Sequence, residues 1–419
     1  MASNTSEAPE AYYSQGLRAR FQTDGIRAEQ AALAAKAEAY ADIAYEVDET
    51  KYLARSEARV KAGGLPTSVP AGWPTALKGP LVWTSNDFPE ENEYVYTLTN
   101  DDKAELLEAL KHFKEHGLDG NKVSKETFPL PKLGKELDKV CQDVYEGRGF
   151  SIVRGLKPED YELEDLTVIY LGISSYVAER RGKQDQRGSM LIHVIKRGDQ
   201  TDDQYSEDKP FHTDTVTDCL CLFTQSLAEV GGRSVVASAW TVYNELAATR
   251  PDLIHTLAAP DWPFDTYGRE PPYYKRALQY WHQDKLITSF SRRLLVGHLP
   301  FEPRTPGIPG LTEAQAEALD AVHFIARKHE IKPRMEKGDL RFINNMALLH
   351  RREAFENSGD TKRHLVRIWL NNEDMCWKLP APLQLAWARV FDDEGRGEHW
   401  DIAPVVQNGK IMRIGGSCD

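Results

Sequence analysis

Helical patterns dominate the N-terminal part of the chain. An alanine-rich stretch from about Glu10 to Lys61, with Glu and Lys interspersed, predicts a helical arm that ends before Gly63 and Pro66. The same kind of spacing predicts further helices at residues 101–116, 132–145, 161–180, 240–249 and 312–330. We expect the arm to cover the main body or to mediate a homodimer contact.

Short alternating segments dominate from Ser189 onward, after one earlier segment of the same kind. In an alternating segment every second side chain points to the same face, as in a strand. The pattern predicts strands at residues 149–154, 189–195, 217–223, 233–238, 286–291, 338–344 and 363–370. Because strands and helices do not alternate regularly, we expect an α+β fold, or a double-sheet β-core with a helical periphery.

Composition and charge narrow the classes of partner. The chain has 419 residues, and its 41% apolar content is ample for a sizeable core. Its formal net charge of −12 does not attract phosphate backbones, so we expect no nucleic-acid partner. No apolar run approaches the roughly 18 residues that a membrane span needs, and we expect no membrane contact.

The cysteines indicate a reducing compartment. The chain has five cysteines, and their odd number and their spacing fit neither a zinc site nor a disulfide framework. The first ten residues also lack the basic start and apolar core of a secretory signal. We therefore expect a cytoplasmic protein. Cys219 and Cys221 lie on one face of a predicted strand, and we expect them to be small buried residues without a redox role.

The first chemical motif is Phe211-His212-Thr213-Asp214. In an extended segment the side chains of His212 and Asp214 point to the same side and can reach one ion. His350 follows just beyond a predicted strand that ends near Asn344. Two histidines and one carboxylate form a facial triad that suits iron(II) and leaves positions open for substrate and oxygen. The alternative is a surface His and Asp that share no ligand.

A second motif is the predicted strand that begins at Arg363. Alternation places Arg363, Leu365, Arg367 and Trp369 on one face of it. The two arginines lie roughly 13 Å apart at the backbone, at about 3.3 Å per residue, and their long side chains can converge on one small dianion. The alternative is an outward-facing pair of surface arginines.

These motifs together resemble the taurine dioxygenase (TauD/TfdA-like) family of 2-oxoglutarate-dependent oxygenases. The resemblance rests on the order of the His-x-Asp motif, the distant His350 and the Arg-x-x-x-Arg strand. Segments 147–156 and 231–238 are also similar to that family. The resemblance covers about residues 65–380, which leaves an N-terminal arm at 1–64 and a C-terminal extension at 381–419, packed on the core.

What the resemblance implies is an iron(II)- and 2-oxoglutarate-dependent dioxygenase with a double-stranded β-helix, or jelly-roll, core. It implies that the triad binds the iron and that Arg363, helped by the Ser234 hydroxyl, holds the distal carboxylate of 2-oxoglutarate. Arg367 would lie near the carboxylate that chelates the metal. Ser234 stands where the family often has Thr, so the hydroxyl is kept.

The expected reaction oxidises an unactivated C–H bond with dioxygen and releases succinate and carbon dioxide. The outcome can be hydroxylation, desaturation or cyclisation, and the substrate is expected to be a small carboxylate-bearing metabolite such as an amino acid. Three alternatives are an iron oxidase acting without 2-oxoglutarate, a zinc hydrolase and a non-catalytic jelly-roll binding module. The arginine strand argues against the oxidase, and the lack of an HExxH motif argues against the zinc hydrolase. The intact triad argues against the binding module.

Candidate substrate contacts are Phe211, Asn344, Asn345 and Arg292. The two asparagines precede His350 at a predicted strand end, where they could also make ordinary hydrogen bonds. Arg292 and its neighbour Arg293 follow a predicted strand. They could bind an acidic substrate, or they could form a solvated pair.

Three further residues have ordinary structural explanations. His193 alternates within a predicted strand, and we expect it to be a satisfied histidine and not a fourth ligand. Trp240 and Tyr243 follow the plausible N-cap Ser238, and we expect them to be core residues.

Overall fold

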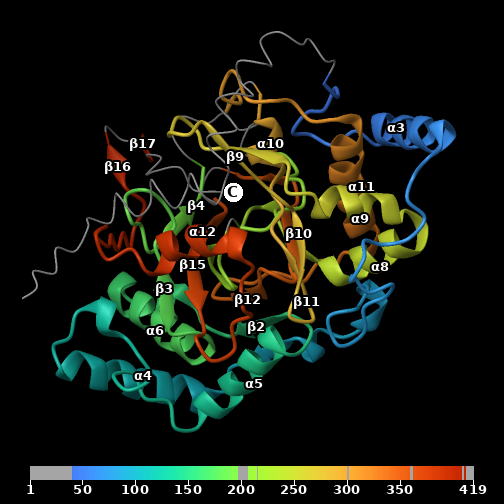
Figure 1. The fold of residues 1–419 in the computed structure, drawn as a ribbon. Helices are drawn as coiled ribbons and strands as arrows, with labels where there is room; N and C mark the ends of the chain where they lie inside the picture. The colour runs from blue at the N-terminus through green and yellow to red at the C-terminus, as the bar shows by residue number, and fades with distance from the viewer. Residues whose placement is uncertain are drawn as a thin grey trace, which may run out of the picture.

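The structure is a computed structural model that describes residues 40–196, 206–214, 216–299, 302–358, 362–407 and 410–411. It combines helices and strands as an α+β protein, as the sequence predicts (Figure 1). Within the described residues, no helix is both long and apolar enough to cross a membrane.

The largest sheet is almost wholly antiparallel. Its strands run in the order β1-β2-β12-β5-β15-β3, and β4 also pairs with β15; only β1 and β2 are parallel to each other. The strands are β1 (Val95–Thr97), β2 (Phe150–Arg154), β3 (Arg180–Gly182), β4 (Ile192–Val194), β5 (Cys219–Ser226), β12 (Leu340–Asn344) and β15 (His364–Asn371). The predicted strands at 149–154, 217–223, 338–344 and 363–370 are therefore confirmed.

Helices cover one face of this sheet. They are α4 (Asn100–Glu115), α5 (Leu133–Tyr145) and α6 (Leu163–Val177), grouped on one side in Figure 1. Thr99 begins α4 with a capping box, which satisfies backbone donors that a helix start leaves open. Cys219 and Cys221 are fully buried in this core, as expected. The alternation along β5 and β15 thus places one set of side chains here and leaves the other set for the opposite face.

The opposite face looks onto a second β-layer with its own helices. In that layer β7 (Ser234–Ser238) pairs with β13 (Leu348–Arg352), and β6 (Val230–Gly231) pairs with β14 (Phe355–Glu356). Helices α8 (Ala239–Thr249), α9 (Pro251–Ala258) and α11 (Glu313–His329) pack around it. Trp240 and Tyr243 are buried in this core, as expected.

Two hairpins and a short helix connect α9 to α11. The hairpins are β8 (Trp262–Asp265) with β9 (Tyr273–Arg276), and β10 (Gln279–His282) with β11 (Lys285–Thr288). The strand expected at 286–291 therefore ends early, because the chain turns at Ser291 into α10 (Arg292–Val296). The short 3-10 helices elsewhere are Ser85–Asp87, Glu91–Glu93, Gly120–Lys122 and Pro158–Asp160.

The N-terminal arm contains less helix than predicted. Helix α3 (Glu49–Ala62) begins at its cap Asp48, whereas the preceding described residues are not helical; residues 1–39 lie outside the described part. Tertiary contacts override alanine propensity there, since Ala41 N–H donates to the Leu311 carbonyl. Arg55 of α3 bonds Glu313 of α11, so the arm lies against the body.

The C-terminal part returns to the large sheet. Helix α12 (Ala381–Phe391) lies beside β3, where Lys183 N–H donates to the Val390 carbonyl. Strands β16 (Val406–Gln407) and β17 (Lys410–Ile411) form a short hairpin beyond it.

Candidate metal centre

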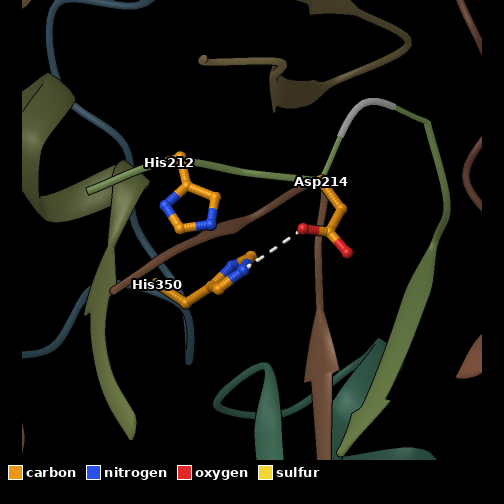
Figure 2. A group of neighbouring side chains, drawn as sticks. All are labelled: His212, Asp214 and His350. Atoms are coloured by element: carbon orange, nitrogen blue, oxygen red, sulfur yellow. Dashed lines mark ion pairs between the residues drawn. The ribbon is translucent and has the colours of Figure 1, made fainter. Parts of the chain in front are cut away.

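Backbone pairing brings the two histidines together. His350 lies beyond the end of β12 at Asn344, as predicted, and it also lies inside a further strand, β13, opposite Val236 of β7. An isolated antiparallel bridge joins it to His212, with N–H to carbonyl distances of 2.9 Å and 2.8 Å. Figure 2 shows His212 and Asp214 on one extended segment, facing His350 across the bridge. The sequence missed β13 because its residues, LLHRR, do not alternate.

The three side chains can offer ligand atoms to one ion. One atom from each of His212, Asp214 and His350 lies within 4.8 Å of the others. His350 Nε2 is 3.4 Å from Asp214 Oδ1, the ion pair dashed in Figure 2. His212 Nδ1 lies 3.0 Å from the Pro210 carbonyl oxygen, which can only accept, so Nδ1 carries the proton and the lone pair is on Nε2. Two nitrogens and one oxygen fit iron(II).

Asp214 is oriented by two donors from β15. Trp369 Nε1–H donates to Asp214 Oδ2 at 2.5 Å, and Arg367 Nη1 lies 3.1 Å from the same oxygen. All three side chains are buried. These contacts hold Oδ2 toward β15 and leave Oδ1 on the side of His350. The sequence reasoning missed Trp369 as a functional residue, although its place on the same strand face as Arg367 was a signal for it.

Asn345 supports the metal segment and does not project as a free substrate contact. Its Oδ1 accepts Asp214 N–H at 2.8 Å, and its Nδ2 donates to the carbonyls of Asp214 and Thr217. On the other side, Thr213 exchanges hydrogen bonds with the backbone of Phe290. The backbone of the His-x-Asp segment is therefore fixed from both sides.

Asn344 and Phe211 also make hydrogen bonds to other parts of the protein. Asn344 Nδ2 donates to the Val144 carbonyl of α5, and its Oδ1 accepts Met346 N–H. Phe211 is fully buried, and its N–H donates to His323 Nδ1. The structure thus places both residues in the scaffold around the triad.

Arg292 is occupied by a carboxylate of the protein itself. Its guanidinium forms a 2.7 Å ion pair with Asp320 and also donates to the Ala44 carbonyl, while Arg293 pairs with Glu302. Both arginines are buried, so the expected solvated pair is wrong. The sequence could not reveal this, because Asp320 lies on a different helix, α11.

Arg363 and Arg367 are buried at the centre, which makes the surface alternative wrong. Arg363 Nε–H donates to the Gly232 carbonyl at 2.8 Å, two residues before Ser234 on β7. A Cβ on Gly232 would lie 2.9 Å from Arg363 Cδ, so the glycine makes room for the arginine. Gln184 Oε1 accepts from Arg367 Nε and fixes the second arginine.

His193 has partners away from the triad, as expected. Its Nδ1 lies 2.8 Å from His364 Nε2, and its Nε2 lies 2.8 Å from the Asp401 carbonyl oxygen. Burial, followed by the neighbouring His193, lowers the pKa of His364 to about 3. Both imidazoles are therefore neutral structural groups near pH 7.

Two sequence relatives share most of the chain. The taurine hydroxylase-like protein SAT17 of Stachybotrys chartarum is 34% identical over 342 residues, covering 78% of this chain and 88% of that protein. FR-33289 synthase of Streptomyces rubellomurinus is 27% identical over 323 residues, covering 71% and 91%.

Solved structures show the same fold at low sequence identity. Asparagine oxygenase in complex with Fe(II), 2S,3S-3-hydroxyasparagine and succinate has a TM-score of 0.52 and 14% identity, covering 66% of this chain and 93% of that chain. The oxygenase OrfP in complex with Fe, succinate and (3S)-hydroxy-L-Arg has a TM-score of 0.50 and 14% identity, covering 67% and 94%.

A family model described as taurine catabolism dioxygenase TauD, TfdA family, matches residues 109–369, well over half of the chain. The expected class, a 2-oxoglutarate-dependent non-haem iron dioxygenase, is confirmed. On the family model and the SAT17 relative, this chain belongs to the TauD/TfdA family.

Proposed function

We propose that His212, Asp214 and His350 bind the iron(II) of this dioxygenase. The observation that carries the proposal is the convergence of their ligand atoms within 4.8 Å, with Asp214 already oriented by two donors. Two imidazoles and one carboxylate on one side of the ion leave its other side open for 2-oxoglutarate and dioxygen.

We propose that Arg363 binds the distal carboxylate of 2-oxoglutarate with help from the Ser234 hydroxyl. Arg363 is 2% exposed and is anchored through Nε on the Gly232 carbonyl, which supports a fixed direction for its remaining donors. A guanidinium can bind a carboxylate through two parallel hydrogen bonds. Arg367 would lie between the co-substrate and Asp214, where its 3.1 Å contact neutralises part of the charge of the metal ligand.

The bound iron, 2-oxoglutarate and dioxygen supply an oxidant strong enough for an unactivated C–H bond, with succinate and carbon dioxide as by-products. The protein's own part is positional. The Asn345 and Thr213 contacts fix the metal segment, and Trp369 and Arg367 fix the carboxylate. Their burial keeps water away from these contacts, which strengthens them.

The proposed substrate is a small carboxylate-bearing metabolite, and an amino acid is the first class to test. Two solved structures of similar fold hold hydroxylated asparagine and hydroxylated arginine, which supports this class. Hydroxylation, desaturation and cyclisation all remain within the proposal, because each begins with oxidation of a C–H bond.

The finer architecture is also a proposal. Two facing β-layers with the triad between them support a jelly-roll core, with an arm at 1–64, an oxygenase domain at 65–380 and an extension at 381–419. A cytoplasmic location and a homodimer through the arm stay predictions. Light scattering on the full chain and on a chain lacking residues 1–61 tests the dimer, and an unchanged oligomeric state would contradict it.

Anaerobic titration of the protein with iron(II) and then 2-oxoglutarate tests the centre. A weak visible charge-transfer band is expected when 2-oxoglutarate chelates the iron. The band should disappear in His212→Ala and should need more 2-oxoglutarate in Arg363→Ala, whereas the surface variant Arg233→Ala should behave as the unmodified protein. Iron binding without a band would favour an oxidase that does not use 2-oxoglutarate. Iron binding without any turnover of 2-oxoglutarate after dioxygen is admitted would favour a binding module.

A further inference from the structure

Leaving aside Arg363, the proposed 2-oxoglutarate residue, Arg276 differs from the other buried arginines in its surroundings. Six buried arginines each contact a carboxylate of the protein within 3.1 Å: Arg154, Arg292, Arg293, Arg341, Arg351 and Arg367. Arg276, at the end of β9, is 3% exposed, and among the described residues no carboxylate pairs with it. A buried charge without a counter-ion is costly, so this position calls for an anion from outside the chain.

The contacts of Arg276 leave its guanidinium incompletely satisfied. Its Nη1 donates to the Ser289 hydroxyl at 2.6 Å, and its buried Nε has no acceptor within the described part of the chain. The guanidinium carbon lies 4.2 Å from the ring centroid of Phe264 and 5.9 Å from that of Tyr274. Aromatic faces attract the cation but accept few of its five hydrogens.

The half-buried Tyr280 lies beside this guanidinium. Burial raises the pKa of Tyr280, and the charge of Arg276 and a side-chain hydrogen bond from Arg276 oppose that rise. The Tyr280 hydroxyl donates to the Ala277 carbonyl at 3.0 Å. An anion that entered here would meet a cation that is itself only 3% exposed, a condition under which a charge-assisted hydrogen bond is strong.

The position of Arg276 connects it to the metal segment. Ser289, its hydrogen-bond partner, precedes Phe290 in the chain. Phe290 exchanges two hydrogen bonds with Thr213, at 2.7 Å and 2.9 Å, and Thr213 lies between His212 and Asp214. Arg276 is thus linked through Ser289 and Phe290 to Thr213, the residue between the two metal ligands.

We propose that Arg276 binds a carboxylate of the prime substrate beside the metal segment. This inference rests on the proposed function and deepens it, because it makes the substrate an anion recognised through its carboxylate. It also replaces Arg292, which is already paired with Asp320, as the residue that recognises an acidic substrate.

The test measures anion binding and thermal unfolding of the anaerobic protein loaded with iron(II) and saturating 2-oxoglutarate. The probes are acetate, methanesulfonate and acetamide, and the variants are Arg276→Met and the matched control Arg292→Met. Acetate should raise the Tm of the unmodified protein, acetamide should not, and the dissociation constant for acetate should be at least tenfold weaker in Arg276→Met. Without anion, Arg276→Met should unfold at the same or a higher temperature, because an uncompensated charge is removed, whereas Arg292→Met should unfold at a lower one.

Each other outcome overturns the inference. If Arg276→Met lowers the Tm as much as Arg292→Met and acetate affects both proteins equally, Arg276 is a structural residue held by its aromatic neighbours. Stabilisation by methanesulfonate but not by acetate would exclude the carboxylate. The visible 2-oxoglutarate band separates this failure from that of the proposed function, because it should be unchanged in Arg276→Met, and its absence from the unmodified protein would instead overturn the metal centre.

Discussion

Replacing Trp369 with Phe removes one hydrogen bond from the metal-binding carboxylate and keeps most of the apolar volume. The indole N–H of Trp369 lies 2.5 Å from Asp214 Oδ2, and Arg367 holds the same oxygen from 3.1 Å. With the indole donor gone, Oδ2 loses one of its two contacts from β15, and the carboxylate can rotate more freely about its Cβ–Cγ bond. We expect Asp214 Oδ1 to spend less time in the direction of His350.

The magnitude follows from the kind of bond that is lost. A hydrogen bond to a charged group contributes about 1.5–3 kcal/mol. Since about 1.4 kcal/mol corresponds to a tenfold change in a binding constant, loss of the orienting contact should weaken iron(II) binding roughly ten- to a hundredfold. Residues that orient metal ligands have effects of about this size. A lost donor also leaves Asp214 more negative, which acts in the opposite direction, so the measured change reports which effect is larger.

The assay is an anaerobic competition titration of iron(II) against a chelator, with Trp369→Phe and the control Trp262→Phe. Trp262 is fully buried and donates its indole N–H to the Thr256 carbonyl at 2.9 Å. This hydrogen bond joins β8 to α9 and involves no metal ligand. Trp262→Phe should lower the free energy of unfolding without changing iron affinity. An iron dissociation constant within twofold of the unmodified value in a folded Trp369→Phe protein would refute the orienting role.

Three further changes test the support around the centre. Gly232→Ala places a Cβ 2.9 Å from Arg363 Cδ at a positive φ of 73°, so 2-oxoglutarate titrations should show more than tenfold weaker binding with unchanged iron affinity; equal 2-oxoglutarate affinity would contradict this. Asn345→Ala removes three buried hydrogen bonds around Asp214 and should cost about 2–4 kcal/mol in urea unfolding, whereas Asn345→Asp keeps the acceptor but turns a buried carboxylate toward two carbonyl oxygens and should cost at least as much. Burial, reinforced by nearby arginines, lowers the pKa of His323 to about 3, so the unfolded chain takes up a proton first as the pH falls. Stability should therefore fall below about pH 6.5 by about 1.4 kcal/mol per pH unit from this group, and unfolding measured at pH 7 and 4.5 should show a smaller difference in His323→Asn; an identical difference would exclude the histidine.

The local sequence pattern was sufficient to predict a residue's place where that place depends on its neighbours in the sequence. The spacing of His212 and Asp214 places both on one side of an extended segment, and the alternation from Arg363 through Trp369 places those side chains on one face of β15. Helix starts were also readable, because a cap such as Thr99 acts within its own turn. These features involve residues that lie within a few positions of each other.

The sequence pattern predicted the wrong secondary structure where contacts between distant segments decided the local structure. Residues 40–48 of the arm are not helical, because their backbone bonds Arg292 of α10 and Leu311 just before α11. His350 lies in β13, a strand that exists because β7 and the His212 segment pair with it from both sides. The stability of such a strand comes from pairing with its neighbours, so its own sequence need not alternate between apolar and polar residues.

The sequence by itself therefore determined the candidate ligands, the arginine strand and the α+β class, since residue type and spacing carry that information. Only the tertiary structure decided which charged groups meet. Trp369 reaches Asp214 across 155 positions of the chain, and Asp320 occupies Arg292 while no described carboxylate pairs with Arg276. The physical reason is that the free energy of a buried charge depends on the partner that folding brings to it, and that partner comes from a distant part of the chain.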